Sequence, residues 1–114
     1  GESDANNRLS EVYEESFIKL IEQLEKDQGR DDLYFVIGRI NEYARSRPDN
    51  EHWRRVRESQ VKLGKTPGNA WIDTDDLNGG DAEQPNGGIH FPRKGAVSLG
   101  QRFADKAVEL IDKQ

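Results

Sequence analysis

Apolar residues recur every three or four positions in three segments of the chain, which is the spacing of one face of an α-helix. The first segment spans residues 9–28 and stops before Gly29, a residue type that commonly ends helices. The second covers residues 51–63 and follows Asn50, a favourable N-cap, while the third covers residues 94–112. The pattern therefore predicts three amphipathic helices.

Two shorter segments carry continuous apolar runs instead of a helical repeat. Residues 33–37 read LYFVI and residues 70–73 read AWID, and both are rich in β-branched and aromatic side chains. Such runs are typical of strands buried on both faces of a parallel sheet. The loop that follows, residues 74–92, is heavy in Gly, Asp and Asn. Loops of that length inside a compact domain are usually functional or disordered.

The order helix, strand, helix, strand, helix predicts an α/β fold whose parallel strands are joined by crossover helices. Two strands that are buried on both faces need neighbours at their edges, and the sequence offers no other good strand. We therefore expect residues 1–114 to form part of one larger α/β domain and to be only marginally stable alone.

Composition narrows the functional classes. The net charge of −5 argues against a nucleic-acid surface, which needs a basic stripe. No apolar run approaches the ~20 residues that a membrane span requires. Cysteine is absent, which excludes disulfides, thiolate metal ligands and a cysteine nucleophile. The two histidines lack metal-ligand spacing and the carboxylates do not follow a calcium-loop pattern, so no metal or other cofactor is expected.

His90 stands between the glycine-rich loop and the third predicted helix. In open α/β sheets, ligand sites lie beyond the carboxyl ends of the strands, and the loop of residues 74–92 leaves from such an end. The residues themselves leave two interpretations open. His90 is either a solvated loop histidine or a catalytic base at the mouth of a cleft.

Five segments together resemble a known family. They are GESDA (residues 1–5), FVIGRI (35–40), the W..VR..Q spacing (53–60), AWIDTDDL (70–77) and HFPRKGAVSLGQRFADKA (90–107). In this order they resemble the C-terminal half of the sialate O-acetylesterase-like carbohydrate esterases, which belong to the SGNH/GDSL hydrolase superfamily. The resemblance implies a flavodoxin-like three-layer α/β/α sandwich with a parallel sheet, incomplete in this chain. It also implies removal of acetyl groups from carbohydrates, and it is compatible with a secreted or periplasmic location.

By this resemblance, His90 is the general base that takes a proton from a serine hydroxyl and later protonates the sugar alkoxide. Gly1 and Glu2 would line the pocket near the oxyanion hole, where backbone N–H groups stabilise the developing negative oxygen. Glu2 is equally interpreted as a charged residue at a frayed terminus. The family's nucleophile lies in a Gly-x-Ser block of the N-terminal half, and Ser3 matches a non-nucleophilic position of GESD. The chain is therefore expected to carry the base without the nucleophile and to be inactive alone.

The family usually has an aspartate two or three residues before its histidine, where this chain has glycines. Asp81 and Asn86 are the candidates for orienting His90, and the carboxylates of DTDD, residues 73–76, are alternatives. A Ser–His dyad without an orienting group is a further alternative. For Arg57 and Gln60 we expect a structural role that braces the sheet.

The expected partners are an acetylated carbohydrate substrate and the N-terminal half of the same domain. The competing hypothesis is a non-catalytic α/β module that binds sugars or another partner and has kept the shape of the fold. The glycines before His90 favour this second view for the isolated chain. A Gly-x-Ser-Asn-type block in the upstream coding sequence would favour the esterase.

Overall fold

The computed structural model describes residues 1–42, 50–78 and 89–114 of the chain. Its elements, in chain order, are α1 (Asn7–Gln28), β1 (Val36–Gly38), α2 (Glu51–Gly64), β2 (Ala70–Ile72) and α3 (Arg93–Asp112). This order confirms the predicted α/β alternation. The expected loop of residues 74–92 lies partly outside the described residues.

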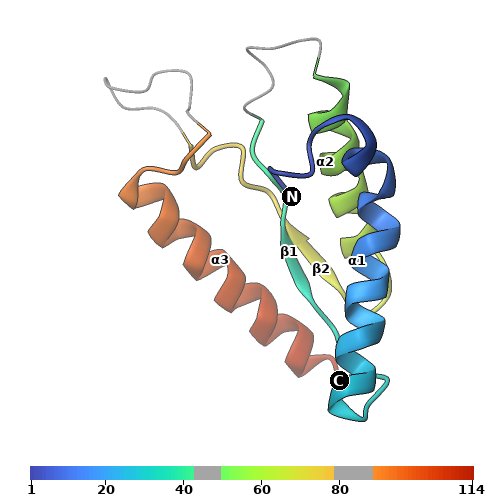
Figure 1. Cartoon of the computed structure of the whole chain (residues 1–114). Helices are drawn as coiled ribbons and strands as arrows, with labels where there is room; N and C mark the ends of the chain where they lie inside the picture. The colour runs from blue at the N-terminus through green and yellow to red at the C-terminus, as the bar shows by residue number, and fades with distance from the viewer. Residues whose placement is uncertain (43–49, 79–88) are drawn as a thin grey trace.

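β1 and β2 pair in parallel, as predicted, with Val36 opposite Ala70 and Gly38 opposite Ile72. The two strands have helices on both faces, with α3 on one side and α1 and α2 on the other (Figure 1). Close approach of α3 to β1 depends on Gly38, because a Cβ atom there would lie 2.9 Å from the Phe103 ring. The structure is therefore α/β, with a two-stranded parallel sheet between helices.

Both strands are shorter than predicted. The first was expected over residues 33–37 but lies at Val36–Gly38, because its neighbour begins only at Ala70. Just before the ladder, the N–H of Phe35 donates to the side-chain oxygen of Asn69 at 3.0 Å. The second was expected over residues 70–73 and ends at Ile72, after which the Asp73 carboxylate accepts the N–H of Asp75 at 3.0 Å. A side chain thus replaces a backbone partner at the start of the sheet, and a turn held by the Asp73 side chain follows its end.

The three predicted helices are present with small shifts at their ends. The expected ranges 9–28, 51–63 and 94–112 are observed as Asn7–Gln28, Glu51–Gly64 and Arg93–Asp112. Asn50 caps α2 as predicted, since its side chain accepts the N–H of Trp53 at 3.0 Å. Gly29 ends α1 with φ of 65°, a conformation that glycine adopts without a steric penalty.

One cluster of the hydrophobic core lies at the carboxyl end of the sheet. Ile40, Trp53 and Val56 form a buried cluster, and Ala5, Tyr13 and Ile89 pack against it. Ala5 precedes α1, Ile40 follows β1 and Ile89 comes shortly before α3, so three distant segments meet there. In Figure 1 this is the end of the sheet where the N-terminus lies.

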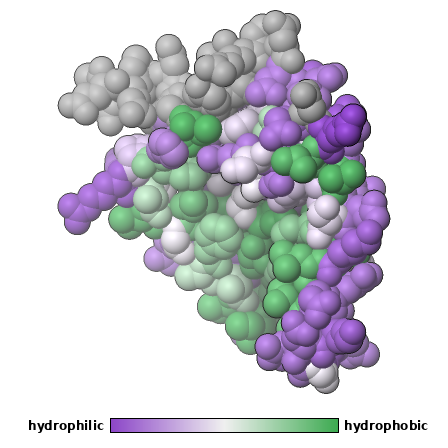
Figure 2. All heavy atoms as spheres, in the orientation of Figure 1, coloured by the Kyte–Doolittle hydropathy of each residue, from purple (hydrophilic) through white to green (hydrophobic). Residues whose placement is uncertain are grey.

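Apolar side chains also remain uncovered. Figure 2 shows them gathered between α1 and α3, over the sheet. Several large ones on the two helices are at least 40 % exposed, namely Leu9, Val12, Ile18, Leu20, Leu24, Val97, Val108 and Ile111. Within the described part of the chain the sheet has two strands, so each strand has one open edge. Among these same residues, the helices are too short or too polar to cross a membrane.

Candidate functional site

The first residues of the chain form a turn against the carboxyl end of β1. The N–H of Asp4 donates to the Gly1 carbonyl at 3.1 Å, and the N–H of Ala5 donates to the Glu2 carbonyl at 3.2 Å. A Cβ atom at Gly1 would lie 2.7 Å from Nε2 of Gln60 and 3.1 Å from Cγ2 of Ile40. Only a residue without a side chain fits this position without displacing its neighbours.

Gln60 connects this turn to the sheet and to α1. Its Oε1 accepts the N–H of Ile40 at 2.8 Å, and its Nε2 donates to the Tyr13 hydroxyl at 3.1 Å. Burial raises the pKa of the Tyr13 hydroxyl, and the hydrogen bond from Gln60 offsets part of that rise. Gln60 is itself buried, which confirms the structural role expected for it.

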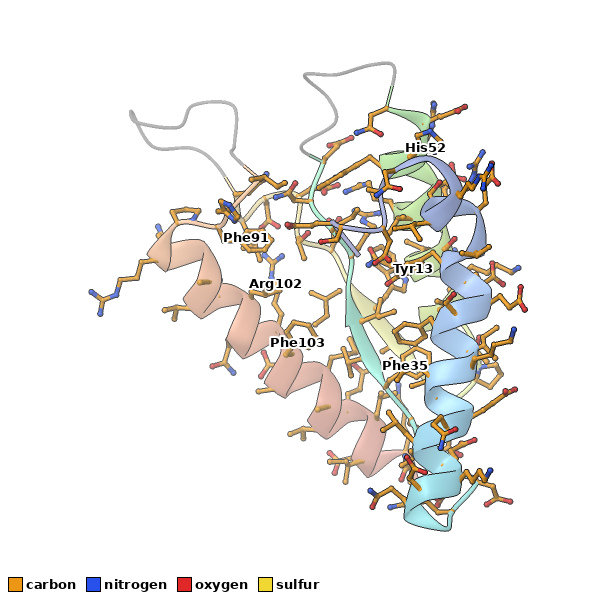
Figure 3. All side chains as sticks on the ribbon, in the orientation of Figure 1. Tyr13, Phe35, His52, Phe91, Arg102 and Phe103 are labelled. Atoms are coloured by element: carbon orange, nitrogen blue, oxygen red, sulfur yellow. The ribbon has the colours of Figure 1, made fainter. Side chains whose placement is uncertain are left out.

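His90 lies at the same end of the molecule, exposed, between Ile89 and the start of α3. The Ile89 carbonyl accepts a hydrogen bond from Nδ2 of Asn41 at 2.8 Å, and the Ile89 side chain packs on the Ile40 cluster. The segment that carries His90 and the turn at Gly1 and Glu2 therefore contact one cluster. Figure 3 shows the neighbouring Phe91 at this end of the sheet, above Arg102 of α3.

The structure does not test the two residues predicted to orient the His90 ring. Asp81 and Asn86 lie outside the described residues. Within the described segments, the His90 ring has no hydrogen-bond or ion-pair partner. Glu2 is exposed. The predicted roles of Gly1, Glu2 and His90 thus remain predictions, now with positions for all three.

The DTDD carboxylates, which were alternatives for orienting His90, are bound to arginines instead. Both terminal nitrogens of Arg57 donate to the Asp75 carboxylate at 2.7 Å, and Nη2 of Arg39 donates to it at 2.8 Å. Arg39 also donates to Asp73 at 2.7 Å, and Arg102 of α3 donates to Asp76 at 2.7 Å. These ion pairs join the end of β2 to β1, α2 and α3.

The ion pairs shift the pKa values of their members. Burial by itself would lower the pKa of Arg57, but its hydrogen bonds and charge interaction with Asp75 outweigh that effect and raise it. The hydrogen bond from Arg102 holds the pKa of Asp76 below its usual value of 3.8. Arg57 also donates to the Ile40 carbonyl at 2.7 Å, which confirms its expected bracing role.

The structure brings together one serine–histidine pair that the sequence did not suggest. Ser10 Oγ of α1 and His52 Nδ1 of α2 are hydrogen-bonded at 2.9 Å, and Arg55 donates to the same hydroxyl at 3.2 Å. The Glu51 carboxylate lies 3.7 Å from the other nitrogen of the His52 ring. Ser10 is only 2 % exposed, so a substrate carbonyl has no access to its hydroxyl. The pair therefore joins two helices rather than forming a nucleophilic site.

Asn41 is the residue near His90 that the sequence analysis missed. It is 1 % exposed and holds the carbonyl next to His90. A signal was available, because a polar residue just after a buried strand of a parallel sheet lies on the edge where ligand sites occur. In the described parts of the chain, no group of three metal-binding side chains gathers at this edge or elsewhere.

Comparison with known proteins gives one family. The family model described as carbohydrate esterase, sialic acid-specific acetylesterase, matches residues 1–109. Searches of curated proteins and of solved structures gave no significant match. The matched range includes the turn at Gly1, the segment of Ile89 and His90, and most of α3.

Proposed function

The chain belongs to the sialic acid-specific acetylesterases, a family of carbohydrate esterases, and on that premise we propose that it carries the general base of a serine-dependent carbohydrate O-acetylesterase. At the level of the family, this activity is hydrolysis of a carboxylic ester in a carbohydrate. The finer proposal names His90 as the base and an SGNH-type sandwich as the complete fold. The description of the family makes O-acetylated sialic acids the first substrates to test.

One observation carries the proposal. The turn at Gly1 and Glu2 and the segment of Ile89 and His90 contact the same buried cluster around Ile40, at the carboxyl end of β1. Parallel α/β sheets bind ligands at this edge. Two family segments that are distant in sequence thus lie where one substrate could contact both.

In the proposed reaction, a serine hydroxyl attacks the acetyl carbon while His90 accepts its proton. The carbonyl oxygen becomes negative in the tetrahedral intermediate, and backbone N–H groups near Gly1 and Glu2 stabilise it. The intermediate collapses when the sugar oxygen leaves with the proton held by His90. Water then hydrolyses the acetyl-serine, again with His90 as the base.

The nucleophile is proposed to come from further sequence of the same domain. In these 114 residues Ser10 has a histidine partner but is buried, and Ser3 lies in the GESD turn at a position that the family does not use as nucleophile. The open edge of β1 and the uncovered apolar side chains of α1 and α3 support an additional strand and its flanking layers. We expect that part to supply the serine.

The test compares the 114-residue chain with a version that includes the upstream coding sequence, here called the extended protein. We expect the extended protein to release acetate from 4-nitrophenyl acetate and from O-acetylated sialic acid, and the chain alone to release none. An extended protein that is folded and binds the sugar without hydrolysing either ester would favour the non-catalytic module instead.

A further inference from the structure

Each carbonyl of the three residues that follow β1 accepts a hydrogen bond from a side chain. The Arg39 carbonyl accepts from the Thr74 hydroxyl at 2.6 Å, and the Ile40 carbonyl accepts from Arg57 at 2.7 Å. The Asn41 carbonyl accepts from the indole N–H of Trp53 at 2.7 Å. We call residues 39–41 the platform. Side chains from α2 and from the segment after β2 thus fix the platform on two sides.

The amides of Arg39 and Ile40 are also hydrogen-bonded. The N–H of Arg39 continues the ladder to the Ile72 carbonyl at 3.1 Å, and the N–H of Ile40 donates to Gln60 at 2.8 Å. A backbone segment with most of its polar groups hydrogen-bonded in a largely buried setting has little freedom to move. The platform is therefore a rigid support at the carboxyl end of the sheet.

From this support, the Asn41 side chain reaches the segment that carries His90. Its Nδ2 donates to the Ile89 carbonyl at 2.8 Å, across 48 positions of the sequence. The Asn41 side chain is almost fully buried, which shields its end of this hydrogen bond from water. The Ile89 side chain packs on the cluster that includes Ile40, but apolar packing is not directional. The hydrogen bond is what sets the orientation of the peptide unit that enters His90.

We propose that Asn41 is a positioning residue for His90, because it fixes the carbonyl that directly precedes the histidine and so fixes where the imidazole stands. The proposal rests on the proposed function, in which His90 must meet a serine hydroxyl within hydrogen-bond reach. A displacement of that histidine by about 1 Å is enough to lower the rate by about 100-fold. Asn41 acts through the backbone of Ile89, without contact to the substrate.

The first test reads the position of His90 without any activity. In the extended protein labelled with ¹³Cε1-histidine, the NMR signals of His52 and His90 are assigned by their loss in His52→Gln and His90→Gln. In Asn41→Ala and in Asn41→Asp, which replaces the donor by an acceptor of the same shape, we expect the His90 signal to shift and broaden. The His52 signal should stay in place. Asn69→Ala is the matched control, because Asn69 holds the N–H of Phe35 at the other end of the sheet.

The second test measures kinetics in the extended protein. We expect Asn41→Ala to lower kcat for 4-nitrophenyl acetate by about 10- to 100-fold with KM changed less than about twofold, as a misplaced base predicts. Asn69→Ala should leave kcat close to the wild-type value. Asn41 variants that keep both the His90 signal and kcat would overturn the proposal. An extended protein without esterase activity would refute the proposed function, while the NMR comparison would still decide whether Asn41 positions His90.

Discussion

Both terminal nitrogens of Arg57 bond to the two carboxylate oxygens of Asp75, each at 2.7 Å. The pair joins α2 to the segment after β2, and Arg57 adds a hydrogen bond to the Ile40 carbonyl. Their side chains are 14 % and 23 % exposed, which shields the pair from much of the surrounding water. Arg57 thus links the segment after β2 to the platform, from which the Asn41 side chain reaches the Ile89 carbonyl.

The Arg57–Asp75 pair gives the first prediction. We expect Arg57→Met to destabilise the extended protein by about 2–3 kcal/mol, because a partly buried carboxylate loses its two-point partner. Arg57→Lys should recover only part of the loss, since an ammonium group cannot bond both oxygens in the same way. Arg54→Met, at an exposed position one turn earlier on α2, is the control. Equal urea midpoints for the Arg57 and Arg54 variants would contradict the prediction.

The second prediction concerns acid stability. Arg102 lowers the pKa of Asp76 below 3.8, so the folded chain keeps this carboxylate ionised at pH values where the unfolded chain binds a proton. The ion pair therefore stabilises the fold above that pH, and its contribution disappears as the pH falls through the lowered pKa. We expect Arg102→Gln to lose less stability than the wild type between about pH 5 and pH 3. At neutral pH the pair is exposed and its loss should cost less than about 1 kcal/mol.

Urea titrations of the extended protein at several pH values measure how the free energy of unfolding changes with pH in each variant. Arg93→Gln is the matched control, because it removes the same charge from the exposed first residue of α3. If Arg102→Gln and Arg93→Gln show the same pH dependence, the link between Arg102 and the pKa of Asp76 is wrong.

Two glycines of α3 give the third prediction. A Cβ atom at Gly95 would lie 1.9 Å from the Leu77 carbonyl oxygen, whereas one at Gly100 would meet no atom within 4 Å. We expect Gly95→Ala to destabilise the fold by about 2 kcal/mol, because α3 must move away from the segment after β2. Gly100→Ala should stabilise it by about 0.5–1 kcal/mol through helix propensity. Thermal unfolding of the extended protein that ranks the two variants the other way would refute the close packing at Gly95.

The fourth prediction concerns the open side of the molecule. Val97 and Ile111 of α3 are each 67 % exposed, and the apolar area over the sheet is uncovered (Figure 2). We expect the 114-residue chain to bind a hydrophobic dye and to unfold at a low temperature with weak cooperativity. The extended protein should bind much less dye and unfold cooperatively. A sharp transition of the short chain as a monomer, without dye binding, would mean that it does not need further layers.

Much of the fold could be predicted from the sequence because its signals are local. The apolar repeat of α1 and the caps at Gly29 and Asn50 depend on residues within one or two turns, and the structure confirms them. The strands were less accurate. An apolar run such as residues 33–37 shows that side chains are buried, but the start of the partner strand at Ala70 decides which residues join the ladder.

The long-range polar contacts could not be predicted. Asn41 and Ile89 are 48 positions apart, and Ser10 and His52 are 42 apart. Periodicity shows which face of a helix is buried but carries no information on which polar group meets which across the core. The DTDD carboxylates illustrate the consequence, because their arginine partners come from three other elements or element ends. From the sequence they were predicted as alternative partners that orient the His90 ring.

The central claim is that the exposed imidazole at residue 90 performs the proton transfers of ester cleavage. Its most direct test is kcat of the extended protein for 4-nitrophenyl acetate in two matched variants, His90→Ala and His52→Ala. The account predicts a loss of about 10²- to 10⁴-fold for His90→Ala, the range expected for a missing general base, and a change of less than about threefold for His52→Ala. Unchanged turnover in a folded His90→Ala protein would contradict the account.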